Sequence, residues 1–131
     1  MCIHRSPEPL EWLETALRSV FAAAPGLGGV LAATMSENPT HCNFDHGKSA
    51  CPHCRDIAPE RFIAEVNCAM ERGMHSVAPD ADMLFHDWAW RSAPGEGPAT
   101  EFKRKVLDLL PKHPHVFVIS VSEWGLPTHV G

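Results

Sequence analysis

The residues with the clearest metal-binding chemistry lie between positions 41 and 54, in the stretch HCNFDHGKSACPHC. Cys51 and Cys54 form a CxxC pair, a spacing at which two thiolates can hold one metal ion. Cys42 lies upstream of this pair, and His46 lies between Cys42 and Cys51. Three thiolates and one imidazole suit tetrahedral Zn²⁺, so the first prediction for this loop is a structural zinc site.

Other interpretations of the same loop stay open. Cys42 could form a disulfide with Cys51 or Cys54, or the thiols could be reduced and have no role. The chain has five cysteines, and this odd count leaves at least one thiol unpaired. A redox-active CxxC is disfavoured, because in thioredoxin-like proteins that motif directly follows a strand and here a long loop intervenes.

Three other segments each combine a carboxylate with residue types that suit sugars: SENPTHC (36–42), HDWAWR (86–91) and SEWGLP (122–127). Glycoside hydrolysis needs two carboxyl groups, one that protonates the leaving oxygen and one that acts as nucleophile or base. Tryptophan rings can stack on the apolar faces of sugars. The predicted catalytic residues are Glu37, Asp87 and Glu123, and the predicted substrate-binding residues are Asn38, His41, Trp88, Trp90, Arg91 and Trp124.

Composition excludes several other functions. The net charge is −5 and the only basic cluster is Lys-Arg-Lys at 103–105, so neither nucleic acid nor an anionic membrane is an expected partner. No apolar run is long enough to span a bilayer. The glycine-rich PGLGG (25–29) precedes an apolar run and does not open a helix, which argues against a phosphate-binding loop. Carbohydrate is the expected ligand.

The elements that must position these residues follow from the apolar pattern. Ser6, followed by Pro7 and Glu8, is a typical helix start, and Pro59 with Glu60 is a second. The first apolar run reads as a strand buried on both faces, as in parallel sheets. Helices are predicted at 7–24, 59–77 and 100–110, and strands at 30–35, 83–90 and 116–121.

Helices and strands alternate, which predicts an α/β fold of three parallel βα-type units within a single domain over 1–131, with a Cys/His-rich loop at 41–57. The ends of the parallel strands bring the three acidic segments to one edge. A sheet of three strands would leave apolar edges unpaired, so we expect missing barrel segments or self-association. Because the sequence ends shortly after the third strand, we expect a fragment of a (β/α)₈ barrel, which needs about 250 residues.

The order of three segments supports this expectation: GGVLAATMSENPTHC, CPHCRDIAPERFIAEVNCAM and PDADMLFHDWAWR. Together they resemble the middle of bacterial (β/α)₈ barrels related to glycoside hydrolases, in the hexosaminidase-like and α-glucuronidase-like group, from Glu11 onward. The resemblance implies strands four to six of such a barrel, with Glu37 as acid/base. Hexosaminidases of this type carry an Asp-Glu doublet where this chain has Ser36-Glu37-Asn38. The resemblance also implies that the isolated chain is inactive. The rival hypothesis is a non-catalytic α/β zinc module.

Overall fold

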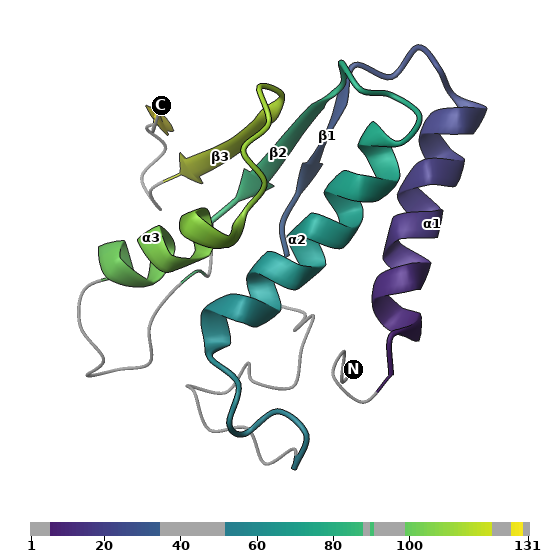
Figure 1. The fold of residues 1–131 in the computed structure, drawn as a ribbon. Coiled ribbons are helices and arrows are strands. Elements are labelled where there is room, and N and C mark those ends of the chain that lie inside the picture. Colours follow the sequence, from purple (N-terminus) through teal and green to yellow (C-terminus); the bar gives the residue numbers. More distant parts are fainter. Residues whose placement is uncertain (1–5, 35–51, 88–89, 91–98, 122–126, 130–131) are drawn as a thin grey trace.

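A computed structural model describes residues 6–34, 52–87, 90, 99–121 and 127–129. Helices and strands alternate along these residues, as predicted (Figure 1). None of the helices in the described ranges is both long and apolar enough to cross a membrane. The elements are α1 (Glu8–Ala23), β1 (Gly29–Ala32), α2 (Pro59–His75), β2 (Asp82–His86), α3 (Ala99–Leu109), β3 (Val116–Val121) and β4 (Pro127–His129).

The helix starts follow the local chemistry of the sequence. Ser6 Oγ accepts a hydrogen bond from the backbone N–H of Glu8, and Pro59 is the first residue of α2. The predicted strand at 83–90 is too long, because β2 ends at His86. Beyond the strand, the backbone N–H of Trp90 donates to the carbonyl of Asp87. Helix positions are therefore predicted well from sequence, while this strand end is not.

The three predicted strands form a parallel sheet in the order β1, β2, β3. The register aligns Leu31, Leu84 and Phe117 across the three strands. A fourth strand, β4, which was not predicted, pairs antiparallel with β3. Pro127 is the first residue of this strand. Proline has no backbone N–H to donate to a neighbouring strand, and the first position of a strand tolerates this. The fold class α/β with parallel strands is confirmed, with an antiparallel addition at one edge.

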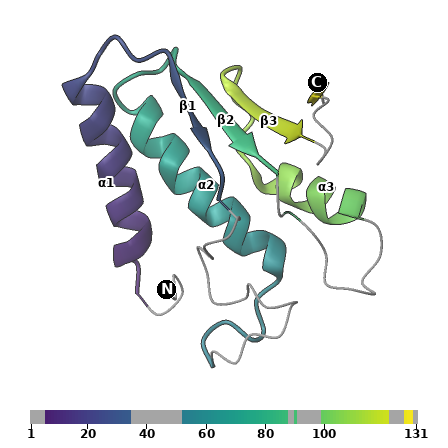
Figure 2. The ribbon, with the colours of Figure 1, turned by 180° about the vertical axis from the view of Figure 1, so that it is seen from behind.

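All three helices lie on one face of the sheet, as the two opposite views show (Figures 1 and 2). Met83 and Phe85 of β2 point toward the helices and are fully buried. On the other face, Leu31 is 60% exposed and Phe117 is 46% exposed. The prediction that the first strand is buried on both faces is therefore wrong, because the described helices cover only one face.

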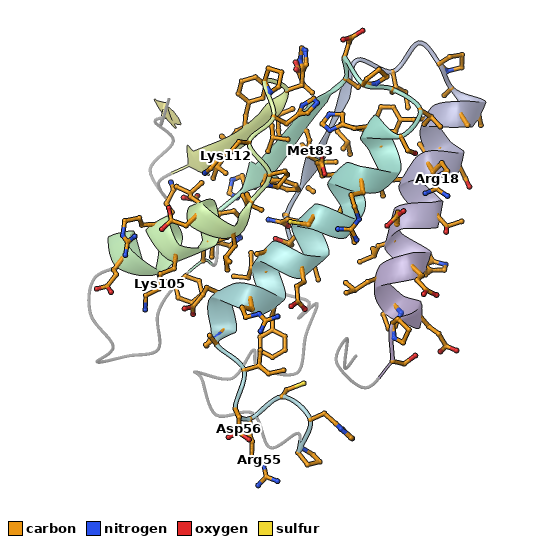
Figure 3. The ribbon with its side chains drawn as sticks, viewed as in Figure 1. Arg18, Arg55, Asp56, Met83, Lys105 and Lys112 are labelled. Carbon is orange, nitrogen blue, oxygen red and sulfur yellow. The ribbon has the colours of Figure 1, made fainter. Side chains whose placement is uncertain are left out.

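The main core lies between the sheet and the helices. Met83 is near its centre (Figure 3), and it packs with Phe85, Ile63 and Met74. α3 contributes Phe102 and Val106 to this core. A second, smaller cluster joins Cys54, Phe62 and Val66 at the start of α2, with Leu10 and Leu13 of α1 packed against it. Leu10, Leu13, Leu17 and Phe21 thus face inward as their spacing predicts, whereas Val20 is half exposed.

α1 and α2 are in close backbone contact at Gly73. A Cβ atom added to Gly73 would overlap the backbone carbonyl of Glu14. At the same place the Glu14 carboxylate binds Arg18 at 2.8 Å and Arg72 at 3.1 Å. Both ion pairs are solvent-exposed and contribute little to stability. The missing side chain at Gly73, rather than the charges, sets how closely the two helices pack.

We predict that Gly73→Ala lowers the free energy of unfolding by about 1–3 kcal/mol, because its methyl group overpacks the α1–α2 contact. Gly26→Ala is the matched control, since a Cβ at Gly26 meets no atom within 4 Å. Urea denaturation of both variants measures the difference. Equal midpoints for the two variants would contradict the close contact.

Candidate functional site

Three of the residues proposed from sequence as site residues lie in the described part of the chain: Asp87, Trp90 and Cys54. The expected carboxyl edge of the sheet is present, because β1, β2 and β3 are parallel. The other proposed residues lie outside the described ranges: Glu37, Asn38, His41, Cys42, His46, Cys51, Trp88, Arg91, Glu123 and Trp124.

Asp87 lies immediately after β2, at the carboxyl edge of the sheet. Its backbone N–H donates to the carbonyl of Ile119, which extends the contact between β2 and β3 by one residue. Its side chain accepts a hydrogen bond from Lys103 Nζ of α3 at 2.6 Å. Only 14% of the Asp87 side chain and 17% of the Lys103 side chain are exposed, so this ion pair is largely buried.

Strand alternation explains the direction of Asp87. Met83 and Phe85 of β2 point toward the helices, and Asp87 continues this alternation to meet Lys103 of α3. His86 has the opposite parity and shares the open face with Leu84. Asp87 therefore contacts the helix layer, not the open face. Sequence analysis missed Lys103, because nothing in the spacing links it to Asp87.

Trp90 is one of the proposed sugar platforms, and it is only 3% exposed. It packs in the main core with residues such as Ala32 and Phe102, and among the described residues its indole Nε1–H has no hydrogen-bond partner. An indole buried in this way presents no face for a sugar ring. In this structure Trp90 is therefore a core residue, which does not support its predicted role as a sugar platform.

Cys54, a predicted zinc ligand, is fully buried at the turn before α2 and packs with Phe62 and Val66. Both disulfides considered from sequence, Cys42 with Cys51 and Cys42 with Cys54, involve residues outside the described ranges and stay predictions. Among the described residues no three His, Cys, Asp or Glu side chains converge as metal ligands would. The Cys₃His site stays a prediction, because its other three ligands lie outside these ranges.

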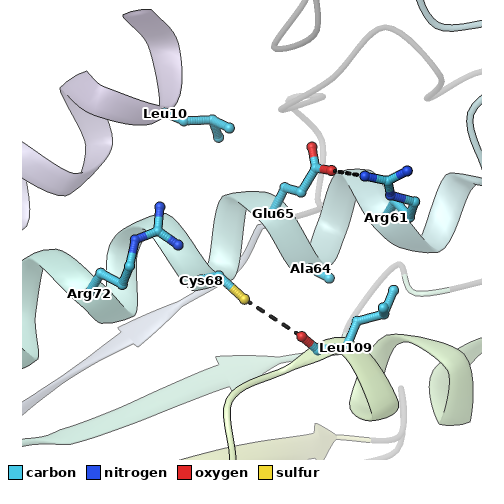
Figure 4. Close-up of a pocket in the computed structure, with 7 residues that line it drawn as sticks. All are labelled: Leu10, Arg61, Ala64, Glu65, Cys68, Arg72 and Leu109. Atoms are coloured by element: carbon cyan, nitrogen blue, oxygen red, sulfur yellow. Dashed lines mark hydrogen bonds and ion pairs between the residues drawn. The ribbon is translucent and has the colours of Figure 1, made fainter. Parts of the chain in front are cut away.

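A separate hollow of about 240 Å³ lies on the outer side of the helix layer (Figure 4). Its polar groups compensate one another: Arg61 binds Glu65 at 3.0 Å, and Arg72 binds Glu14. Burial raises the pKa of the Cys68 thiol, which lies 3.8 Å from the carbonyl of Leu109. A protonated thiol is a poor nucleophile, so Cys68 is not suited to nucleophilic catalysis. Its lining residues are Leu10, Arg61, Ala64, Glu65, Cys68, Arg72 and Leu109.

Comparison with models of protein families, with curated proteins and with solved structures finds no match to this chain. The resemblance to glycoside-hydrolase barrels therefore stays a prediction based on the order of its motifs.

We predict that Lys103→Met lowers the free energy of unfolding by about 2–4 kcal/mol, because the largely buried Asp87 carboxylate loses its ammonium partner. Arg104→Met is the matched control on the same helix, since Arg104 binds Asp108 with both side chains about 60% exposed and such pairs contribute below about 1 kcal/mol. Chemical denaturation measures the free energy of unfolding of the two variants. A loss for Lys103→Met no larger than that of the control would show that the pair is not a stabilising contact.

The zinc hypothesis predicts one zinc ion per chain in protein purified without added metal. Cys51→Ser should remove the metal, because the site would lose one of its thiolates. Cys68→Ser should retain it, because Cys68 lies in α2 away from the loop. Elemental analysis gives the metal content. Metal-free unmodified protein, or full zinc in Cys51→Ser, would reject the predicted ligand set.

Proposed function

We propose that this chain is part of a carbohydrate-active protein of the glycoside-hydrolase type, built on a (β/α)₈ barrel, with its site at the carboxyl edge of β1, β2 and β3. The supporting observation is the strand order. Sequential parallel strands with their helices on one face are typical of barrels, whereas doubly wound sheets reverse direction and cover both faces.

The uncovered face of the sheet supports the same proposal. Leu31, Leu84 and Phe117 align across the three strands and are partly or largely exposed. In a barrel this face points inward, where layers of apolar side chains from the strands fill the interior. A row of apolar residues is therefore what the barrel interior requires. It would be unfavourable on a sheet face left in water.

The geometry of Asp87 changes which acidic residues we propose as catalytic. The Asp87 carboxylate binds the Lys103 ammonium at 2.6 Å on the helix side of the sheet, away from the open face. Its direction toward α3 also suits a positioning residue that fixes the edge of the sheet. We therefore assign the acid/base and second-carboxylate roles to Glu37 and Glu123, which follow β1 and β3 in the sequence. His86 becomes an additional candidate for substrate contact, because it has the parity of the open face.

One feature departs from a barrel. β4 pairs antiparallel with β3, at the edge where a barrel would place its next parallel strand. The proposal therefore requires a parallel strand to replace β4 beside β3 in the whole protein. β4 pairs at only three residues, so this exchange disrupts few backbone hydrogen bonds.

The test uses the full product of the gene that encodes this chain and a panel of aryl glycosides. We predict that Glu37→Gln reduces hydrolysis about 100-fold or more, because an amide cannot exchange a proton as an acid/base residue must. Glu11→Gln is the matched control on the exposed side of α1. Asp87→Asn should lower stability more than it lowers the rate of the folded enzyme. Absence of hydrolysis across the panel, or equal rates for Glu37→Gln and Glu11→Gln, would reject the proposal.

A further inference from the structure

The hollow on the outer side of the helix layer has no role in the proposed carbohydrate chemistry. A row of α2 residues forms its floor, and Leu10 of α1 and Leu109 of α3 bound it on opposite sides (Figure 4). Arg61 and Arg72 lie at the two ends of the row, with Cys68 between them. Its volume of about 240 Å³ is below the range of about 300–1,000 Å³ that is typical of drug-sized ligands. The hollow therefore fits a small molecule.

Arg72 supplies the hollow with hydrogen-bond donors. Its Nε donates to the Glu14 carboxylate at 3.1 Å, which helps to orient the guanidinium. Among the described residues this is the one hydrogen bond of the Arg72 side chain, so its two terminal nitrogens keep their N–H donors available. The side chain is 54% exposed, which leaves these donors accessible to a ligand. The planar pair of terminal nitrogens matches the two oxygens of a carboxylate.

The charges around the hollow favour an anion. Its lining includes two arginines and one glutamate, so one positive charge is in excess. Arg61 binds Glu65 at 3.0 Å, and these two charges compensate each other. Arg72 shares its partner Glu14 with Arg18, so one carboxylate compensates two guanidinium groups. The excess positive charge is thus at the Arg72 end of the hollow.

The rest of the lining is uncharged. Leu109 is a large apolar side chain that is 47% exposed, and Leu10 lies on the other side of the hollow. Burial raises the pKa of the Cys68 thiol, so this group stays protonated near pH 7 and does not repel an anion. A ligand that covers Leu109 removes apolar surface from water, which is favourable.

We propose that this hollow binds a small monocarboxylate that has an apolar body. The terminal nitrogens of Arg72 hold the two carboxylate oxygens, and the apolar body lies against Leu10 and Leu109. Binding forms and breaks no covalent bond. The site is independent of the proposed carbohydrate site, because it lies on the outer side of the helix layer and the carbohydrate site lies at the carboxyl edge of the sheet.

The test is an amide NMR titration of the 131-residue chain with hexanoate, at neutral pH and constant ionic strength. 1-Hexanol has a similar chain without the charge, and acetate has the charge with almost no chain. We expect hexanoate to shift the amide signals of Cys68 and Leu109 to saturation, about tenfold more tightly than either analogue, because each analogue lacks one contact. The amide of Met83, in the main core, should not shift.

Arg72→Gln should weaken hexanoate binding about tenfold, because a neutral amide cannot form the charge-assisted pair with the carboxylate. It should leave the affinity for 1-hexanol unchanged. Arg104→Gln is the matched control, since Arg104 binds Asp108 on α3 and does not line the hollow. Both substitutions remove exposed ion pairs, so both variants should fold.

The absence of saturable shifts with hexanoate, equal affinity for hexanoate and 1-hexanol, or an affinity that Arg72→Gln leaves unchanged would each overturn the proposal. If Arg72→Gln does not fold, the side-chain Nε–H signals of the unmodified protein decide. Hexanoate must then shift the signal of Arg72 and leave that of Arg104 in place, and any other result overturns the proposal. None of these outcomes depends on the proposed carbohydrate chemistry.

Discussion

The burial of Met83 and Phe85 against α2 and α3 is the packing constraint on which the rest of the structure depends. Side chains alternate in direction along a strand. Because Met83 and Phe85 point toward the helices, the direction of each remaining side chain of β2 is determined as well. Leu84 and His86 must then face the open side, and Asp87 must continue toward the helix layer. A shift of one residue in register would bury Asp82, Leu84 and His86 instead and expose Met83 and Phe85.

The two edges of the sheet differ because different elements meet there. At the carboxyl edge, α3 brings Lys103 to Asp87, and one largely buried ion pair fixes the end of β2. At the amino edge, the end of α2 and the connection into β3 bring three histidines together, with the rings of His75 and His113 stacked.

The helix layer depends on close backbone packing as much as on apolar burial. Gly73 lets α2 approach the backbone of α1 at Glu14, while the exposed ion pairs around this contact add little. Because the described helices cover one face, Leu31 of β1 and Phe117 of β3 remain exposed on the other. Further strands of a barrel would cover that face, and this connects the geometry of the described sheet to the carbohydrate proposal.

The sequence by itself determined the positions of the helices and the presence of three parallel strands, because periodicity, helix-start residues and alternation of elements are local signals. It misjudged the length of β2, and it did not predict that Trp90 is buried in the core, since burial depends on which elements pack around a residue. Only the tertiary structure paired Asp87 with Lys103 and stacked His75 on His113, residues 38 positions apart in the chain. Such contacts depend on how separate elements pack, and no spacing within one element encodes them.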